Sequence, residues 1–284
     1  MKLMVQPLQI FSLVALLLTT ACNADTKWRA LNPENTVLMT LPQGKVVIEL
    51  AAQFSPHHAQ QFSKLVKSGH YDGNKFYRVI DGFVAQAGPE NDSVQDKAVP
   101  LLKIEGEWKT DKSWFFTKVQ DQDLFAEQTG FKGGFAIGYN PSEQAAWLTH
   151  CPGTIAMARG NEADSASSHF YIPNGQALRY LDRIMSVFGR VVFGMEHIQA
   201  IKRTAVIEGQ PAVDTRDFTP IVSMEMMSDV PKEQQIIIEV ENTETKTFEE
   251  RLVKRRKRDN PFFYKKPLPV LDVCQVPLKT RLVK

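Results

Sequence analysis

The 284-residue sequence has little of the features that mark several specialised classes of protein. Three cysteines are too few for a small disulfide scaffold, and 16 glycines with 16 prolines exclude a collagen-like or low-complexity chain. Basic and acidic residues nearly balance, at 34 and 32, so the overall charge does not indicate a nucleic-acid or acidic partner. What remains is a chain that is 43% apolar and long enough for one large domain, or one domain with appendages.

The sequence also lacks an apolar run long enough to favour a permanent transmembrane helix. Residues 8–18 form its N-terminal apolar stretch, which is shorter than the roughly 18 residues that a spanning helix needs. This stretch lies between Lys2 and the small residues that precede Cys22, which is the order of a secretory signal. We therefore expect residues 1–24 to be a signal peptide and the protein to be exported to the periplasm.

Two N-terminal processing routes fit the residues before Asp25. The small residues followed by Cys22 resemble a bacterial lipobox, which would leave a lipid on Cys22 as the only membrane attachment. The Cys22-Asn23-Ala24 triplet can equally end an ordinary signal peptide. Export would place Cys151 and Cys274 in an oxidising compartment, where they either pair or remain two separate buried thiols, because sequence gives no distance.

The C-terminal residues 230–284 form a basic extension. From residue 229 onward there are 13 basic and 9 acidic side chains. Thr247-Phe248-Glu249-Glu250 matches a capping box and predicts a helix to about Arg258. The basic residues 254–258 fit either an anionic ligand, such as nucleic acid or lipid, or a solvated helix end. For an exported chain we favour the solvated end, where the helix dipole stabilises cations, and we expect no nucleic-acid partner.

Alternating apolar residues dominate the middle of the chain. They predict a β-hairpin over residues 37–50 with one solvated face, and Ser55-Pro56 then begins an amphipathic helix that ends near Gly69. Further short strands and a second helix follow, and many short strands with two helices indicate a closed β-barrel. The predicted strands are 75–80, 83–87, 153–158, 169–172, 186–192 and 221–226, and the second helix is 195–201.

Three blocks carry a resemblance to a known family. Residues 62–88 read FSKLVKSGHYDGNKFYRVIDGFVAQAG, which closely resembles the cyclophilin signature. Residues 153–172, GTIAMARGNEADSASSHFYI, resemble the family's Met-Ala-Arg loop and the strand after it, and residues 180–189 are similar to its Leu-Asp…Val-Phe-Gly segment. The blocks occur in family order, and the resemblance covers about residues 35–229.

The resemblance implies a mainly β fold, an eight-stranded antiparallel barrel capped by two α-helices. It also implies peptidyl-prolyl cis–trans isomerisation, which needs no cofactor and no metal. The expected substrates are proline-containing segments of exported proteins that are still folding. We expect the protein itself to be a monomer. A non-catalytic binding or chaperone module on the same scaffold is the alternative.

The motif match also assigns site residues. Arg78 corresponds to the family's catalytic arginine. Its guanidinium is permanently charged and can donate a hydrogen bond to the prolyl nitrogen of the substrate. Gln86 would hydrogen-bond the substrate backbone. The other expected substrate-binding residues are Tyr77, Phe83, Val84, Ala158, Arg159, Gly160, His169, Tyr171, Tyr180 and Leu181.

Several of these positions depart from the family pattern. Tyr77 stands where the family has His, Val84 replaces Met, and His169 replaces Gln. Tyr171 replaces Phe, which together with Val84 puts the depth of the proline pocket in doubt. Two further replacements are Tyr180 for Trp and Met185 for His. These changes favour the binding module, whereas retained Arg78, Phe83 and Gln86 favour the enzyme.

A long insertion is the second departure. Residues 89–150 replace a much shorter family loop and contain eight Trp and Phe residues, too many for a disordered linker. We expect the insertion to fold against the barrel. It would serve either as a platform for a partner or substrate, or simply as additional cover for the barrel.

Overall fold

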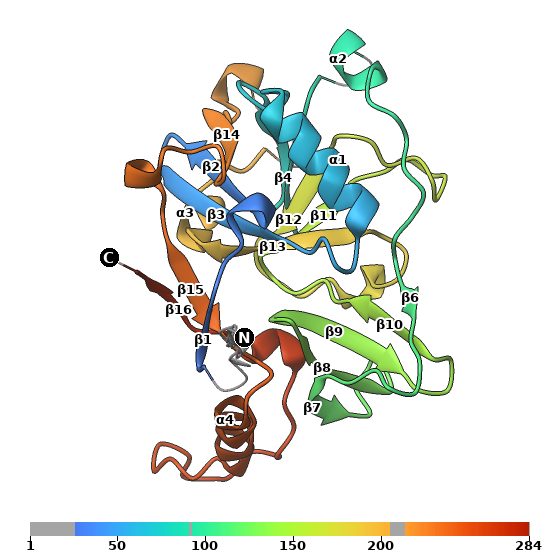
Figure 1. Cartoon of the computed structure of the whole chain (residues 1–284), viewed down its shortest axis with the longest axis vertical. Coiled ribbons are helices and arrows are strands. Elements are labelled where there is room, and N and C mark those ends of the chain that lie inside the picture. The colour runs from blue at the N-terminus through green and yellow to red at the C-terminus, as the bar shows by residue number, and fades with distance from the viewer. Residues whose placement is uncertain (1–25, 91–92, 205–213, 284) are drawn as a thin grey trace, which may run out of the picture.

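The computed structural model describes residues 26–90, 93–204 and 214–283 (Figure 1). Eight antiparallel strands form one curled sheet in the order β14-β2-β3-β13-β11-β12-β5-β4, which confirms the predicted fold class. The strands of this barrel are β2 (Thr36–Leu41), β3 (Gly44–Leu50), β4 (Lys75–Val79), β5 (Val84–Gly88), β11 (Thr154–Met157), β12 (Phe170–Pro173), β13 (Val187–Phe193) and β14 (Ser223–Met226).

Hydrogen bonds close the barrel between its two edge strands. The amides of Gly73 and Phe76, at the start of β4, donate to the carbonyls of Ile221 and Thr219, just before β14. Helices α1 (Pro56–Lys67) and α3 (Met195–Gln199) pack on the barrel, at the positions that the sequence predicted. The side chain of Phe62 enters the barrel core, where it meets aromatic residues of the strands.

Both faces of the β2–β3 hairpin are covered, so the expectation of one solvated face is wrong. Leu38 and Val47 point out of the barrel, yet both are buried against Val230, Ile238 and Val240. These partners belong to the C-terminal extension, whose strands β15 (Ile238–Glu241) and β16 (Thr280–Leu282) form a small sheet with β1 (Trp28–Ala30). The extension thus hides an outer face of the barrel.

The insertion forms a second sheet, which lies below the barrel in Figure 1, in the order β6-β10-β9-β8-β7. Helix α4 (Lys246–Lys257) packs Phe248 and Leu252 against Phe131 of this sheet, and a disulfide joins Cys151 to Cys274. The remaining elements are β6 (Trp108–Lys109), β7 (Thr117–Asp121), β8 (Gln128–Lys132), β9 (Phe135–Asn140), β10 (Ala145–Leu148), α2 (Val94–Lys97) and five 3-10 turns (Pro33–Asn35, Arg179–Leu181, Thr215–Asp217, Lys232–Gln234 and Val273–Gln275).

The start of α4 differs from the predicted capping box. Thr245, and not Thr247, is the N-cap, and its hydroxyl accepts a hydrogen bond from the amide of Phe248. Phe248 and Leu252 are four residues apart and share one helix face with either N-cap, so it is the hydrogen bond to the Thr245 hydroxyl that marks where the helix begins. In the described part of the chain, no helix combines the length and apolar character that crossing a membrane requires. The predicted signal peptide and Cys22 lie outside the described residues.

Candidate active site

The site begins with an irregularity in strand β4. Phe76 pairs with Ala87 of β5, but the next paired residue is Arg78, which lies opposite Gln86. Tyr77 is therefore the extra residue of a β-bulge. A bulge interrupts the alternation of side chains, so the consecutive residues Tyr77 and Arg78 both reach Gln86 instead of pointing to opposite faces.

Gln86 links the arginine to the tyrosine. Its Oε1 accepts a hydrogen bond of 3.1 Å from Nη1 of Arg78, and its Nε2 donates one of 2.7 Å to the hydroxyl of Tyr77. Arg78 is exposed along one side, and its Cζ atom lies 5.3 Å from the ring centroid of Phe83. The guanidinium is thus held between an amide and an aromatic ring while further N–H groups remain available to a ligand.

The tyrosine continues the chain of polar contacts into the insertion. Its hydroxyl lies 2.8 Å from Nδ1 of His169, whose Nε2 lies 3.1 Å from Oδ1 of Asp96 in α2. Burial raises the pKa of Tyr77 to about 12, so the hydroxyl stays protonated and can donate to His169. Gly88 makes room for the imidazole, because a Cβ atom there would lie 2.4 Å from Nδ1 of His169.

These residues line an open groove of about 630 Å³. Seven of the residues expected from the sequence meet in it: Tyr77, Arg78, Gln86, Ala158, Arg159, Gly160 and His169. The insertion supplies a further wall of the groove, formed by Asp96, Lys97, Val99 and Leu101, none of which the sequence analysis named individually. Asp96 lies 73 positions before His169, and no spacing signal in the sequence connects the two.

The other expected residues form an apolar patch next to the groove. Val84 and Tyr171 are buried, Phe83 and Leu181 are partly exposed, and all four belong to one cluster that also includes Ala158 of the groove. The register explains this proximity, since Tyr171 pairs with Gln86 across β12 and β5 and so lies beside it. Tyr180 precedes Leu181 but is 61% exposed, at the rim.

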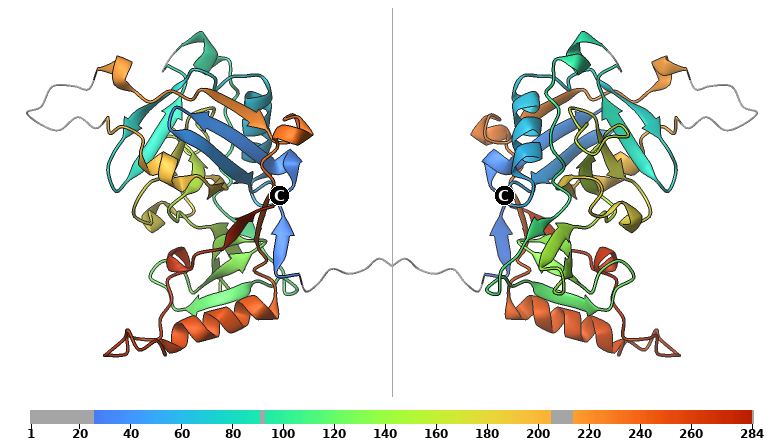
Figure 2. Two further views of the ribbon diagram at one scale, coloured as in Figure 1. Left: turned by 90° about the vertical axis from the view of Figure 1, so that its left-hand side faces the viewer. Right: turned by 90° about the vertical axis from the view of Figure 1, so that its right-hand side faces the viewer.

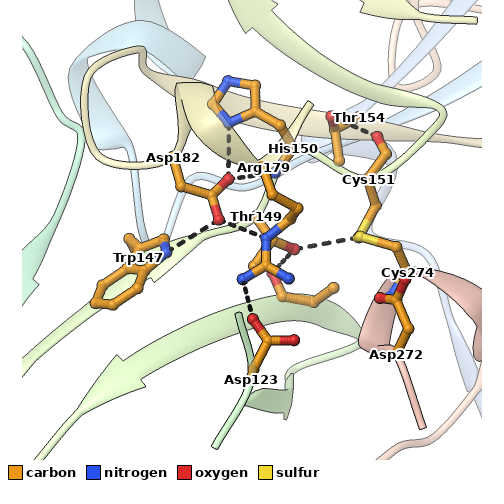
Figure 3. Close-up of a disulfide and its surroundings, with 11 residues drawn as sticks. Asp123, Trp147, Thr149, His150, Cys151, Thr154, Arg179, Asp182, Asp272 and Cys274 are labelled. Carbon is orange, nitrogen blue, oxygen red and sulfur yellow. Dashed lines mark hydrogen bonds and ion pairs between the residues drawn. A yellow bond between two sulfur atoms is a disulfide. The ribbon is translucent and has the colours of Figure 1, made fainter. Parts of the chain in front are cut away.

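Behind this patch, the tyrosine that replaces the family's phenylalanine has a partner from the insertion. The hydroxyl of Tyr171 lies 3.0 Å from Nε2 of the buried His150, whose Nδ1 lies 3.1 Å from Oδ1 of Asp182. Figure 3 shows the Asp182 carboxylate between His150, the Trp147 indole and Arg179. Burial raises the pKa of Tyr171 well above its ordinary value, so this hydroxyl also remains a donor.

The arrangement offers charge stabilisation. No group of three or more His, Cys, Asp or Glu side chains suited to hold a metal occurs among residues 26–90, 93–204 and 214–283. The Arg78 guanidinium is a fixed cation at the edge of an apolar patch, and it can stabilise a lone pair that develops on a bound ligand.

The chain is similar to proteins of one known family. Residues 36–226 match the model of the cyclophilin type peptidyl-prolyl cis-trans isomerases. A probable peptidyl-prolyl cis-trans isomerase of Brucella suis is 31% identical over 182 residues, which cover 63% of this chain and 77% of the relative. Peptidyl-prolyl cis-trans isomerase A of Dickeya dadantii is 29% identical over 185 residues, or 65% of this chain and 75% of the relative.

A solved structure extends the likeness beyond the barrel. Cyclophilin AquaCyp293 from Hirschia baltica superposes with a TM-score of 0.70 and is 28% identical, over 90% of this chain and 93% of that one. This coverage exceeds the 36–226 region that the family model matches. The chain belongs to the cyclophilin family of peptidyl-prolyl cis–trans isomerases.

Proposed function

We propose that this chain accelerates the cis–trans isomerisation of X-Pro bonds in exported polypeptides, with Arg78 as the group that stabilises the twisted amide. The observation that carries the proposal is the position of the Arg78 guanidinium, held by Gln86 at 3.1 Å and over the ring of Phe83. The cation therefore stands where the bond of a proline seated on the apolar patch would turn.

The chemistry of the bond explains why a cation helps. Amide resonance sets a barrier of about 18–20 kcal/mol to rotation, and resonance is lost when the bond is twisted. The prolyl nitrogen then regains a lone pair that is absent from the planar ground state. A donor aimed at this nitrogen stabilises the transition state selectively, and a charged hydrogen bond worth about 1.5–3 kcal/mol gives roughly a ten- to hundredfold gain in rate.

The neighbouring residues would supply positioning. Phe83 and Leu181 present partly exposed apolar surface that suits a proline ring, and the backbone near Ala158 offers an edge for an extended peptide. A substrate held in this way rotates on one side of the bond only, which lowers the entropic cost of reaching the twisted state.

The direct test follows isomerisation in a short X-Pro peptide by NMR exchange spectroscopy. We expect the wild-type protein to accelerate exchange and Arg78→Ala to lose a factor of about ten to a hundred of that acceleration. A folded wild-type protein without any effect on exchange would contradict the enzyme. Peptide binding by such an inactive protein would support the alternative, a binding module for proline-containing segments whose proline pocket is altered at Val84 and Tyr171.

We further propose that the protein works in the periplasm, as a monomer. The signal-like residues 1–24 support export, and so does the Cys151–Cys274 disulfide, because such bonds persist in oxidising compartments. Cell fractionation tests the location. Intact-mass analysis of the processed protein distinguishes a lipid-modified Cys22 from an unmodified N-terminus, and recovery of unprocessed protein from the cytoplasm would contradict export.

A further inference from the structure

A basic, aromatic loop projects from one end of the molecule. Residues 259–270, here called the tail loop, connect the end of α4 to the buried Leu271. In Figures 1 and 2, α4 and the segment that follows it occupy the lower extremity, while α2 lies at the upper one. The tail loop is therefore far from the groove, one wall of which contains the α2 residues Asp96 and Lys97.

The protein holds both ends of this loop in place. Before the loop, Arg256 of α4 donates a hydrogen bond to the backbone carbonyl of Val119 in the insertion sheet. After it, the amide of Leu271 donates to Oε1 of Gln120 at 3.1 Å, and the Cys274 disulfide follows. Since both ends are fixed to the insertion, the loop has a defined place at the surface.

Large apolar side chains in the tail loop are directed into solvent. Phe262 is 83% exposed, Tyr264 is 99% exposed and Leu268 is 79% exposed. Val270, at the end of the loop, is exposed as well. Isolated exposed apolar residues are ordinary, but four of them within nine consecutive residues form a patch of the kind that binds a partner.

Positive charge surrounds these apolar tips. Residues 254–266 contain seven basic side chains and one acidic side chain, Asp259, which pairs with Lys266 at 2.7 Å. Lys254, Lys257 and Lys265 are exposed beside the patch. The chemistry of the partner follows from this combination: it must carry negative charge above an apolar layer.

We propose that the tail loop docks on the interfacial region of a bilayer that contains anionic phospholipids. Lysines next to the apolar tips would meet the phosphate groups, while the aromatic and aliphatic side chains enter the boundary with the acyl chains. A single-stranded nucleic acid would also attract the lysines and stack on Phe262 and Tyr264. Leu268 and Val270 have no stacking surface, however, and gain only from an apolar partner, which favours the bilayer.

Docking through this loop would orient the enzyme on the membrane. Because the tail loop and α2 lie at opposite ends of the molecule, the groove would face away from the bilayer and toward polypeptides in the surrounding compartment. This attachment does not depend on a lipid at Cys22.

Vesicle co-sedimentation tests the docking. The chain from residue 25 onward, which lacks the predicted signal peptide and Cys22, is mixed with vesicles of phosphatidylcholine alone or with 30% phosphatidylglycerol added. Two variants of this chain are compared with it: Phe262→Ser/Tyr264→Ser/Leu268→Ser and Lys257→Gln/Lys265→Gln/Lys266→Gln. Val94→Ser, which removes an exposed apolar side chain at the opposite end, is the matched control. Circular dichroism and peptide exchange verify that each variant is folded.

We expect phosphatidylglycerol to increase binding and each triple substitution to lower the vesicle partition coefficient about tenfold or more, whereas Val94→Ser leaves it unchanged. Anionic vesicles should also protect the tail loop from trypsin. Partitioning that is equal in all variants, or no protection, would overturn the proposal. The proposal would also be overturned if the substitutions abolished binding of a single-stranded oligonucleotide, or dimerisation through the tail loop, but left vesicle binding unchanged.

Discussion

The hydroxyl of Tyr77 accepts a hydrogen bond from Nε2 of Gln86 at 2.7 Å, and this contact determines which end of the Gln86 amide faces Arg78. Were the amide reversed, its NH₂ group would confront the guanidinium, and two donors would oppose each other. The bulge at Tyr77 is what brings all three side chains together. Tyr77 therefore acts as a positioning residue for the arginine.

Replacing this tyrosine by phenylalanine tests its role. In Tyr77→Phe, Gln86 and His169 lose their shared partner, and we expect kcat/KM for an X-Pro peptide to fall about three- to tenfold, the equivalent of one hydrogen bond of roughly 1 kcal/mol. The loss should appear mainly in kcat, because the ring that lines the groove remains while the lost hydroxyl is what orients Arg78 through Gln86. Tyr139→Phe, in the insertion sheet, is the matched control, and an equal loss in both variants would argue against positioning.

A second prediction concerns Tyr171, beside the proline site. Tyr171→Phe restores the residue usual in the family but leaves Nε2 of the buried His150 without its hydroxyl partner. We expect the free energy of unfolding to fall by about 1–2 kcal/mol, while kcat/KM changes less than about twofold because the ring remains. Urea denaturation and peptide exchange measure the two quantities. Unchanged stability would show that the contact contributes nothing.

Glu105 provides a pH-dependent prediction. This insertion residue caps α1, since its two carboxylate oxygens accept hydrogen bonds from the amides of His57 and His58 at 3.1 and 3.0 Å. Partial burial would raise its pKa, but hydrogen bonds from His58 and His57 outweigh burial and lower the pKa to about 2. The unfolded chain takes up the proton near pH 4.3, so the stabilisation is present above that pH and is lost as the pH falls toward 2.

The comparison of wild type with Glu105→Gln measures this contribution. At pH 6 we expect the variant to be less stable by about 1–2 kcal/mol in urea unfolding, and the difference should shrink steadily between pH 4.5 and pH 2. Glu107→Gln removes a half-exposed carboxylate that pairs with Arg183, and it should cost less than about 1 kcal/mol at any pH. A difference for Glu105→Gln that does not depend on pH would contradict the assigned cap.

The disulfide leads to a prediction about the C-terminal extension. Cys151 and Cys274 are 123 residues apart, and their bond attaches the chain after α4 to the residue that directly follows the insertion. The double variant Cys151→Ser/Cys274→Ser should lose about 2–4 kcal/mol of stability, and trypsin should cleave its residues 246–284 faster than those of the wild type. Proteolysis followed by mass spectrometry measures this, and identical cleavage rates would show that packing alone holds the extension.

The sequence predicted most of the barrel because its signals are local. Alternating apolar residues mark the strands, and Ser55-Pro56 with Gly69 marks the limits of α1. The motif blocks also predicted the groove around Arg78. These features depend on neighbouring residues, whose spacing is visible without coordinates.

What the sequence could not predict depends on contacts between distant segments. Asp96 reaches His169, and Glu105 caps α1, only after the insertion has folded against the barrel. The hairpin pattern indicated a solvated face, but the extension covers it. Leu38 packs in one cluster with Ile238, which lies 200 positions later in the chain. The pairing of Cys151 with Cys274 likewise requires a distance that the sequence does not give.

The central claim is that Arg78 stabilises the twisted amide and not the bound substrate. Its most direct test measures, for Arg78→Ala, both kcat/KM by NMR exchange and Kd by titration with the same X-Pro peptide, with Arg281→Ala as the matched control. We predict a ten- to hundredfold loss in kcat/KM, from about 1.5–3 kcal/mol of transition-state stabilisation, with a Kd within about threefold of wild type. An undiminished kcat/KM, or a loss of rate that weaker binding explains entirely, would contradict the account.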